Sequence, residues 1–226
     1  MKIRSACELC GGNTSRLISL CHACQDDLPV LRRCCKLCSI ELGSDTRTDS
    51  VCGQCLQNPP AVDYALSLFH YDSPIDYMVS ELKFNHRLSY AAIFGSLLAE
   101  KILAEDFLAP EAIVPVPLHA KRLVKRGFNQ SLEIATALSK KLNIPIDKSL
   151  VTRTKYTLAQ SDLSAKDRRK NIRGCFEITK LLDYQHIVII DDVVTTGSTT
   201  NELAGLLKEN GVKKVGVWSI ARAVLS

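Results

Sequence analysis

The sequence has no long apolar run and few aromatic side chains. No stretch approaches the roughly 20 apolar residues that a membrane-spanning helix needs. The segment MKIRSACELCGG at the start contains no apolar signal core, which predicts that the chain is not secreted and works in the cytoplasm. Hydrophobic residues make up 46% of the 226 residues and charged residues 23%, a composition typical of a soluble globular protein with one or two domains.

Acidic side chains are scarce between residues 121 and 180. Fifteen basic residues stand against five acidic residues in this window, although the whole chain carries a net charge of only +5. A concentrated positive field indicates a polyanionic ligand, either a pyrophosphate or a nucleic acid. The aromatic residues of the window are Phe128, Tyr156 and Phe176. With so little base stacking available, binding to single-stranded nucleic acid should be mainly electrostatic and should weaken steeply with salt.

Cysteine, in contrast, is abundant, with ten residues. In a cytoplasmic chain this number favours metal binding over disulfides. Eight of them form four Cys-x-x-Cys pairs, and two such pairs complete a tetrahedral site for Zn²⁺. Sequential pairing is the simplest, with interleaved pairing and a redox dithiol as alternatives. The expected ligands are Cys7, Cys10, Cys21 and Cys24 for one ion, and Cys35, Cys38, Cys52 and Cys55 for a second.

The cysteine-rich segment has too few apolar residues to fold alone, so bound metal would supply the missing stability. Asn58-Pro59-Pro60 marks its end. We therefore expect a zinc-ribbon module at residues 1–58 and a second domain at residues 59–226. Cys34 and Cys175 are left over, and we expect Cys175 to be a small core residue.

Residues 186–201, HIVIIDDVVTTGSTTN, carry the clearest functional pattern. Four β-branched residues predict a buried parallel strand, Asp191 and Asp192 follow it, and a helix is expected from Glu202 to Glu209. A helix N-terminus preceded by glycine and hydroxyl groups is suited to phosphate. Two carboxylates beside it suit ribose hydroxyls or Mg²⁺. No Gly-Lys-Ser/Thr follows Gly197, which excludes a Walker A loop. The alternative is an ordinary strand–turn–helix unit with solvated acids.

Further strands are expected near residues 62–71, 112–116, 150–153 and 215–221, with helices starting near residues 74, 90 and 131. The sequence therefore predicts an α/β fold with a mostly parallel central sheet.

Residues 187–199 resemble the phosphoribosyl pyrophosphate signature of type I phosphoribosyltransferases. This resemblance implies that Asp191 and Asp192 hold the ribose hydroxyls. It implies that the 5′-phosphate lies in a loop made of Thr195, Thr196, Gly197, Ser198 and Thr199. It also implies that Mg²⁺ accompanies the pyrophosphate, which would lie in the basic loop after residue 116. The residues of that loop are Arg126, Gly127, Asn129 and Gln130, although a solvated basic loop is the alternative.

In the same family a mobile loop closes over the substrate. The resemblance implies that Gln160, Arg168 and Asn171 belong to such a lid. Two other interpretations remain: a solvated helix face, or contacts to a nucleic-acid backbone. The backbone contacts would come from Arg168, Arg169, Lys170 and Arg173.

Over nearly its whole length the chain resembles the ComF family of competence-related, amidophosphoribosyltransferase-like proteins. The resemblance rests on the Cys-x-x-Cys pairs and on the segments Leu82–Phe84, Pro115–Leu118, Arg126–Ser131 and Asp191–Thr199. It implies a cytoplasmic protein of natural transformation that handles imported single-stranded DNA and keeps a phosphoribosyl pyrophosphate site. DNA-uptake or recombination proteins would be its partners. A transferase reaction on an unidentified base or amine is the alternative function.

Overall fold

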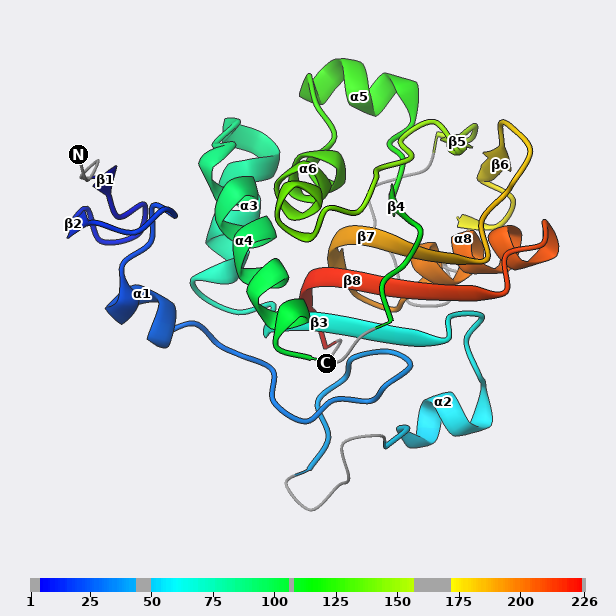
Figure 1. Cartoon of the computed structure of the whole chain (residues 1–226), viewed down its shortest axis with the longest axis horizontal. Helices are drawn as coiled ribbons and strands as arrows, with labels where there is room; N and C mark the ends of the chain where they lie inside the picture. The colour runs from blue at the N-terminus through cyan, green and yellow to red at the C-terminus, as the bar shows by residue number, and fades with distance from the viewer. Residues whose placement is uncertain (1–4, 44–49, 106–107, 157–171, 225–226) are drawn as a thin grey trace.

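The computed structural model describes residues 5–43, 50–105, 108–156 and 172–224. At its centre lies a four-stranded sheet in the order β3-β8-β7-β4, in which all neighbouring strands are parallel (Figure 1). Its strands are β3 (Tyr64–His70), β4 (Ala112–Pro115), β7 (His186–Val194) and β8 (Lys214–Arg222). The predicted α/β class with a parallel central sheet is thereby confirmed.

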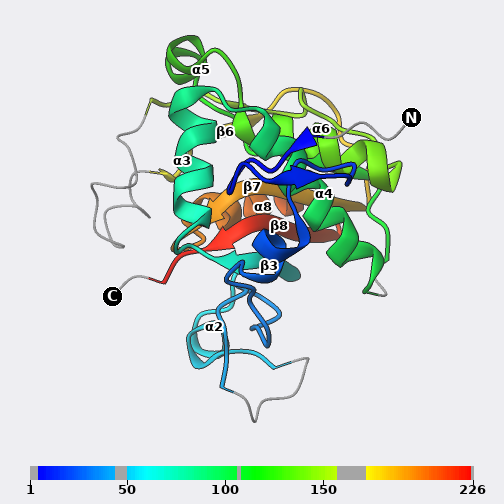
Figure 2. The same cartoon turned by 90° about the vertical axis from the view of Figure 1, so that its left-hand side faces the viewer.

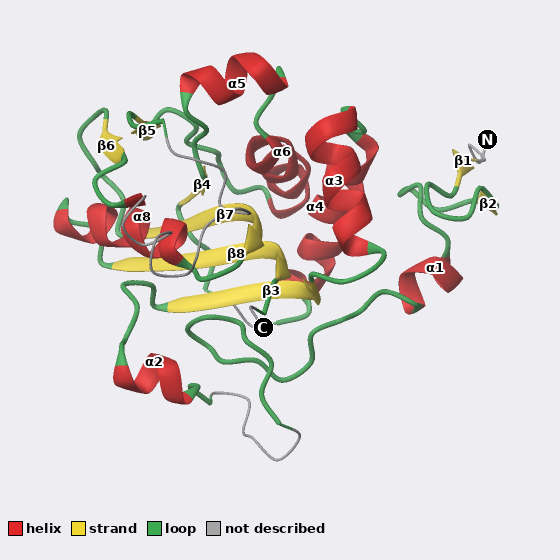
Figure 3. Ribbon diagram, turned by 180° about the vertical axis from the view of Figure 1, so that it is seen from behind, coloured by secondary structure: helices red, strands yellow, loops and turns green. Residues whose placement is uncertain are grey.

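Helices cover both faces of this sheet (Figure 3). The first face carries α3 (Ile75–Asn85), α4 (Ser89–Leu103) and α6 (Gln130–Leu142), and the second carries α8 (Ser198–Glu209). Strand β7 serves both faces because neighbouring side chains of a strand point in opposite directions. Val188 and Ile190 pack in the first core, whereas Ile187 and Ile189 pack in the second.

Helices α4 and α6 approach each other closely at Gly95. A Cβ atom at this position would lie 2.6 Å from the Cβ of Ala137 and 2.8 Å from the carbonyl oxygen of Ile134. Only glycine permits this approach. The close packing holds α6 against α4, and the start of α6 is hydrogen-bonded to side chains near the carboxyl end of β7.

The remaining helices and strands are short. They are α5 (Ala120–Arg126), α1 (His22–Asp26), α2 (Gly53–Gln57), and the antiparallel pairs β1 (Ser5–Ala6) with β2 (Asn13–Thr14) and β5 (Val151–Arg153) with β6 (Phe176–Ile178). Helix α5 lies within the segment expected to be a basic loop. It forms because the side chain of His119 caps it, with Nδ1 accepting from the backbone N–H of Lys121 at 3.1 Å, and because Gly127 ends it at φ 80°.

The cysteine-rich segment is built from two similar units. In the first, the N–H of Cys21 donates to Sγ of Cys7 at 3.4 Å, and in the second the N–H of Cys52 donates to Sγ of Cys35 at 3.3 Å. Cys21 and Cys52 each precede a five-residue helix. We call residues 5–27 the first cysteine unit, and residues 35–43 together with 50–58 the second cysteine unit.

The two units contact different parts of the sheet domain (Figures 1 and 2). The first lies beside α3 and α4, where Tyr90 donates its hydroxyl to the carbonyl of Glu8 at 3.2 Å. The second lies at the β3 edge, where the N–H of Ala65 donates to the carbonyl of Lys36 at 2.7 Å. The segment between them runs antiparallel to β3, with Val30 opposite Phe69. The domain boundary at residue 58 stays a prediction.

Within the described ranges, none of the helices combines the length and the apolar character that crossing a bilayer requires.

Candidate functional site

The two adjacent aspartates lie at the carboxyl end of β7, and both are bonded to the start of α6. The hydroxyl of Ser131 donates to Oδ1 of Asp191 at 3.2 Å. The side-chain amide of Gln130 donates to Oδ1 of Asp192 at 3.1 Å, and Lys83 from α3 forms an ion pair with the same carboxylate. Asp192 is only 3% exposed, whereas Asp191 is partly exposed. The acids therefore face a polar cluster rather than the apolar core.

The surroundings shift the two carboxyl pKa values in opposite directions. Burial and the neighbouring charge of Asp192 raise the pKa of Asp191 to about 8. Burial also acts to raise the pKa of Asp192, but the charge of Lys83 and the hydrogen bonds that Asp192 accepts have the larger effect. The pKa of Asp192 is therefore lowered. The two carboxyl groups therefore titrate as a coupled pair, in which the pKa of Asp191 is raised and that of Asp192 is lowered.

The residues predicted to hold a pyrophosphate extend the same cluster. Arg126 donates to the side-chain oxygen of Gln130 at 2.6 Å. Asn129 caps α6, because its side-chain oxygen accepts from the N–H of Ser131 at 3.0 Å, and its amide donates to the carbonyl of Val116 at 3.0 Å. Gly127 takes a left-handed conformation at φ 80°. The structure therefore brings Arg126, Asn129 and Gln130 together with the aspartates.

The predicted phosphate loop ends where α8 begins. Gly197 is left-handed, at φ 73°, and α8 starts at Ser198, four residues before the expected start at Glu202. The hydroxyl oxygens of Thr196 and Ser198 are 2.7 Å apart, in hydrogen-bonding distance. Asp191, Thr195, Gly197, Ser198 and Thr199 line one small hollow together with Val193, Val194 and Thr200. Backbone N–H groups at the start of a twelve-residue helix make this hollow suited to an anion.

The eight predicted metal ligands form two clusters of four, grouped sequentially. Within each cluster the sulfur atoms lie within 4.8 Å of one another. Sγ of Cys10 is 3.8 Å from Sγ of Cys21, and Sγ of Cys38 is 3.7 Å from Sγ of Cys52. A tetrahedral ion with sulfur bonds of about 2.3 Å separates its ligands by about 3.8 Å. Both clusters therefore have the dimensions of a four-cysteine metal site. Cys175 lies in the core, as predicted.

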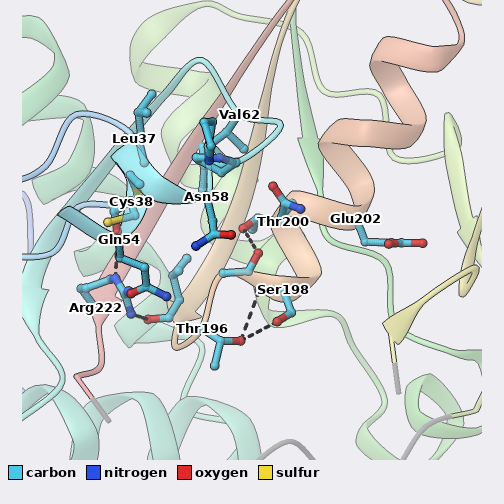
Figure 4. A pocket seen from close by; sticks show the side chains of 18 of the residues that line it. Leu37, Cys38, Gln54, Asn58, Val62, Thr196, Ser198, Thr200, Glu202 and Arg222 are labelled. Atoms are coloured by element: carbon cyan, nitrogen blue, oxygen red, sulfur yellow. Dashed lines mark hydrogen bonds between the residues drawn. The ribbon is translucent and has the colours of Figure 1, made fainter. Parts of the chain in front are cut away.

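A cavity of about 320 Å³ separates the second cysteine unit from the start of α8 (Figure 4). Val62, Val194 and Val217 contribute apolar wall. Figure 4 shows Asn58 reaching from the opposite wall toward the start of α8, with Gln54 beside Arg222. No pattern in the sequence pointed to this cavity, because its two walls are far apart along the chain.

Basic and aromatic side chains surround α5. Tyr156 is 56% exposed, with its ring centroid 5.3 Å from that of His119, and Nζ of Lys121 lies 5.8 Å from the Tyr156 ring. At the other end of α5 the guanidinium of Arg126 lies 5.6 Å from the ring of Phe84, which is 67% exposed. We call this region the α5 surface. Its residues are Phe84, His86, His119, Lys121, Arg122, Lys125, Arg126, Phe128 and Tyr156.

Several predictions fall outside the described residues, namely those for Gln160, Arg168, Arg169, Lys170 and Asn171. Arg173 is described and exposed. Sequence reasoning did not assign Lys83, Ser131 or Phe84 to the site. A lysine that closes an apolar helix face was the available signal for Lys83, but it is equally typical of a solvated helix end.

The sequence is similar to several known proteins. The phosphoribosyl transferase domain matches residues 129–223. Competence protein F of Haemophilus influenzae is 34% identical over 211 residues, which cover 90% of each chain. DNA utilization protein YhgH of Escherichia coli K12 is 35% identical over 209 residues, which cover 91% of each chain. Competence protein ComFC of Streptococcus pneumoniae is 26% identical over 156 residues, 69% of this chain and 67% of that protein.

Among solved structures, the purine phosphoribosyltransferase from Pyrococcus horikoshii matches 60% of this chain and 86% of its own at 18% identity. The TM-score of this match is 0.34.

Proposed function

The chain belongs to the family of competence protein F and DNA utilization protein YhgH, and we propose that it binds and handles imported single-stranded DNA in natural transformation while keeping a ribose-phosphate site of the phosphoribosyl pyrophosphate type. Its place of action would be the cytoplasm, and its protein partners would be DNA-uptake or recombination proteins.

The α5 surface is the observation that carries the DNA-binding proposal. Helix α5 carries four cationic side chains, Lys121, Arg122, Lys125 and Arg126. Exposed rings stand at both ends, with Tyr156 beside His119 and Phe84 beside Arg126. Single strands are bound by positive charge along the backbone together with aromatic rings on which bases stack. The surface provides both, and the aromatic contribution exceeds what the sequence alone predicted.

The acid cluster and the phosphate loop support the ribose-phosphate site. Asp191 lines the hollow at Gly197, Asp192 follows it in β7, and Arg126 and Gln130 join the same hydrogen-bonded cluster. A 5′-phosphate at the start of α8 would therefore place its ribose beside the aspartates. In this site Mg²⁺ would supply positive charge to a bound pyrophosphate.

Zinc is the metal that the two cysteine clusters fit best. Four thiolates in tetrahedral geometry select Zn²⁺ or an iron–sulfur centre, and paired Cys-x-x-Cys units are typical of structural zinc. In each cluster a backbone N–H also donates to one sulfur, from Cys21 to Sγ of Cys7 and from Cys52 to Sγ of Cys35. Such bonds favour the thiolate that a metal requires.

A salt titration of single-stranded DNA binding tests the main proposal. The dissociation constant of a short oligonucleotide should rise steeply between low and moderate salt. Replacing Lys125 with alanine should weaken binding and reduce the slope against the logarithm of salt by about one. Lys140→Ala is the matched control, because Lys140 is an exposed lysine at the far end of α6. A flat titration, or an equal effect of both variants, would contradict the proposal.

An active phosphoribosyltransferase is the second candidate function, favoured by the adjacent carboxylates and by the cations near them, Lys83 and Arg126. Incubation with phosphoribosyl pyrophosphate, Mg²⁺ and a panel of bases and amines should then release pyrophosphate. If calorimetry shows that phosphoribosyl pyrophosphate binds but no pyrophosphate is released, the ribose-phosphate site is supported and the transferase activity is contradicted.

A further inference from the structure

The cavity beside α8 and the phosphate hollow are adjacent compartments. They share Val194, Gly197, Ser198 and Thr200 as lining residues. Asp191 belongs to the hollow and does not line the cavity. A phosphate at the start of α8 would therefore have the aspartates on one side and the cavity on the other.

The cavity suits an uncharged, planar group with polar edges. Its valine side chains, Val62, Val194 and Val217, can contact the faces of a ring. Gln54 and Asn58 each offer a donor and an acceptor, and in the described part of the chain neither amide has a hydrogen-bond partner.

Apart from the predicted metal ligands Cys38 and Cys55, the charged side chains of the lining are Glu202 and Arg222, and both are already bonded to the protein. Glu202 accepts from the N–H of Gly174 at 2.6 Å, and Arg222 donates to the carbonyl of Cys38 at 2.8 Å and to that of Val194 at 3.1 Å. Amide side chains read the edges of unpaired bases, and a cavity of about 320 Å³ lies at the small end of ligand sites. One nucleoside is the ligand of matching size and chemistry.

We infer that the cavity holds one nucleoside of a single strand, whose following phosphodiester lies in the loop Thr195–Thr199 and whose next sugar faces Asp191. The reason is connectivity: a 5′-monophosphate ends at the loop and leaves the cavity empty, whereas a phosphodiester continues into it. The inference rests on the proposed function, because it assumes that single-stranded DNA is the ligand. It adds a site, with the second cysteine unit as one wall.

Calorimetry with three thymidine ligands tests this assignment. The dinucleoside monophosphate TpT should bind about tenfold more tightly than thymidine 5′-monophosphate, because only TpT fills both compartments. The double substitution Gln54→Ala with Asn58→Ala should abolish this tenfold difference and leave thymidine 5′-monophosphate binding unchanged. A single-stranded thymidine 12-mer provides the third ligand and reports on the whole binding surface.

Gln57→Ala is the matched control, since Gln57 is an exposed glutamine of the same helix that does not line the cavity. The inference is overturned if TpT binds no better than thymidine 5′-monophosphate, or if Gln57→Ala lowers TpT binding as much as the double substitution. If the proposed function itself is wrong, the 12-mer does not bind. A 12-mer that binds normally while TpT shows no gain removes the cavity assignment alone.

Discussion

Two neighbouring aspartates lie near the carboxyl end of β7, yet their environments differ in charge. Asp192 is balanced by Lys83 and Gln130, whereas Asp191 receives one hydroxyl bond from Ser131 and lies against the charge of Asp192. The sequence predicted the pair and the buried strand, but it placed the acids after the strand, whereas β7 continues to Val194 and contains both. It could not predict which acid has the raised pKa, because the deciding cation comes from a helix about a hundred residues earlier.

Asp191→Asn should raise stability, and more so at high pH. The pKa of Asp191 is raised to about 8 in the folded protein, against about 3.9 in an unfolded chain. The folded state thus binds this proton more tightly, so stability falls as pH rises from about 4 to about 8. Asparagine removes that dependence. The melting temperature of the variant should exceed that of the wild type by more at pH 9 than at pH 5.

Asp192→Asn serves as the contrasting variant. The pKa of Asp192 is lowered, so its ionised form stabilises the fold above about pH 4. Asparagine should therefore reduce the melting temperature at both pH 5 and pH 9. Identical pH profiles for the two variants would show that the two carboxylates share one environment and would contradict the opposite shifts of their pKa values.

Lys83→Leu should destabilise the protein by about 3 kcal/mol, because it leaves the buried carboxylate of Asp192 without its cation. The comparison variant is Lys101→Leu, which removes an exposed ion pair with Glu105 and should cost less than about 0.5 kcal/mol. Urea unfolding measures both. Combining Lys83→Leu with Asp192→Asn should restore much of the loss, and a double variant as unstable as the single would argue against the ion pair as the cause.

At the scale of helices and strands, the apolar patterns of the sequence predicted most elements. Capping residues determine the helix boundaries that the patterns missed. Strand β7 and the faces of α4 and α6 follow the predicted periodicity. Helix α5 was not predicted, because a histidine side chain caps it and its residues show no apolar stripe. The early start of α8 depends on the left-handed Gly197, a conformation that the sequence permits but does not require.

Two glycine substitutions at α8 distinguish the effect of a left-handed backbone conformation on stability from the effect of helix propensity. Gly197→Ala should cost about 1–2 kcal/mol, since φ is 73° and a Cβ atom is strained there, and it should weaken ribose 5-phosphate binding. Gly205 lies within α8, and a Cβ atom added there would have the Cβ of Ala61 as its nearest neighbour, at 4.0 Å. Gly205→Ala should stabilise by about 0.5–1 kcal/mol and leave binding intact. Thermal unfolding and calorimetry measure both; equal effects would contradict a conformational role for Gly197.

At the scale of the whole molecule, the sequence predicted the metal clusters but not where they dock. Each cluster is encoded by spacing within about twenty residues. The docking depends on contacts between distant segments, such as Arg222 with the carbonyl of Cys38 and Lys36 with Ala65. Those contacts make the second cysteine unit a wall of the cavity, while the first unit contacts α4 through Glu8 and Tyr90.

The two cysteine units should therefore respond differently to loss of metal. Cys21→Ser and Cys52→Ser are equivalent substitutions, since each residue precedes a five-residue helix and lies in one four-cysteine cluster. The wild type should bind two zinc ions per chain by atomic absorption and each variant one. Because metal binding and local folding are coupled, Cys52→Ser should also loosen the cavity wall.

Loss of the cavity wall has a measurable consequence for the ligand site. Arg222 ties Cys38 to the carbonyls of Val194 and Thr195, so an unfolded second unit also releases the backbone of the phosphate loop. Cys52→Ser should weaken TpT binding at least tenfold, and Cys21→Ser should leave it within about twofold of the wild type, because the first unit lies against α4. Equal losses in the two variants would mean that the metals support the fold as a whole rather than this site.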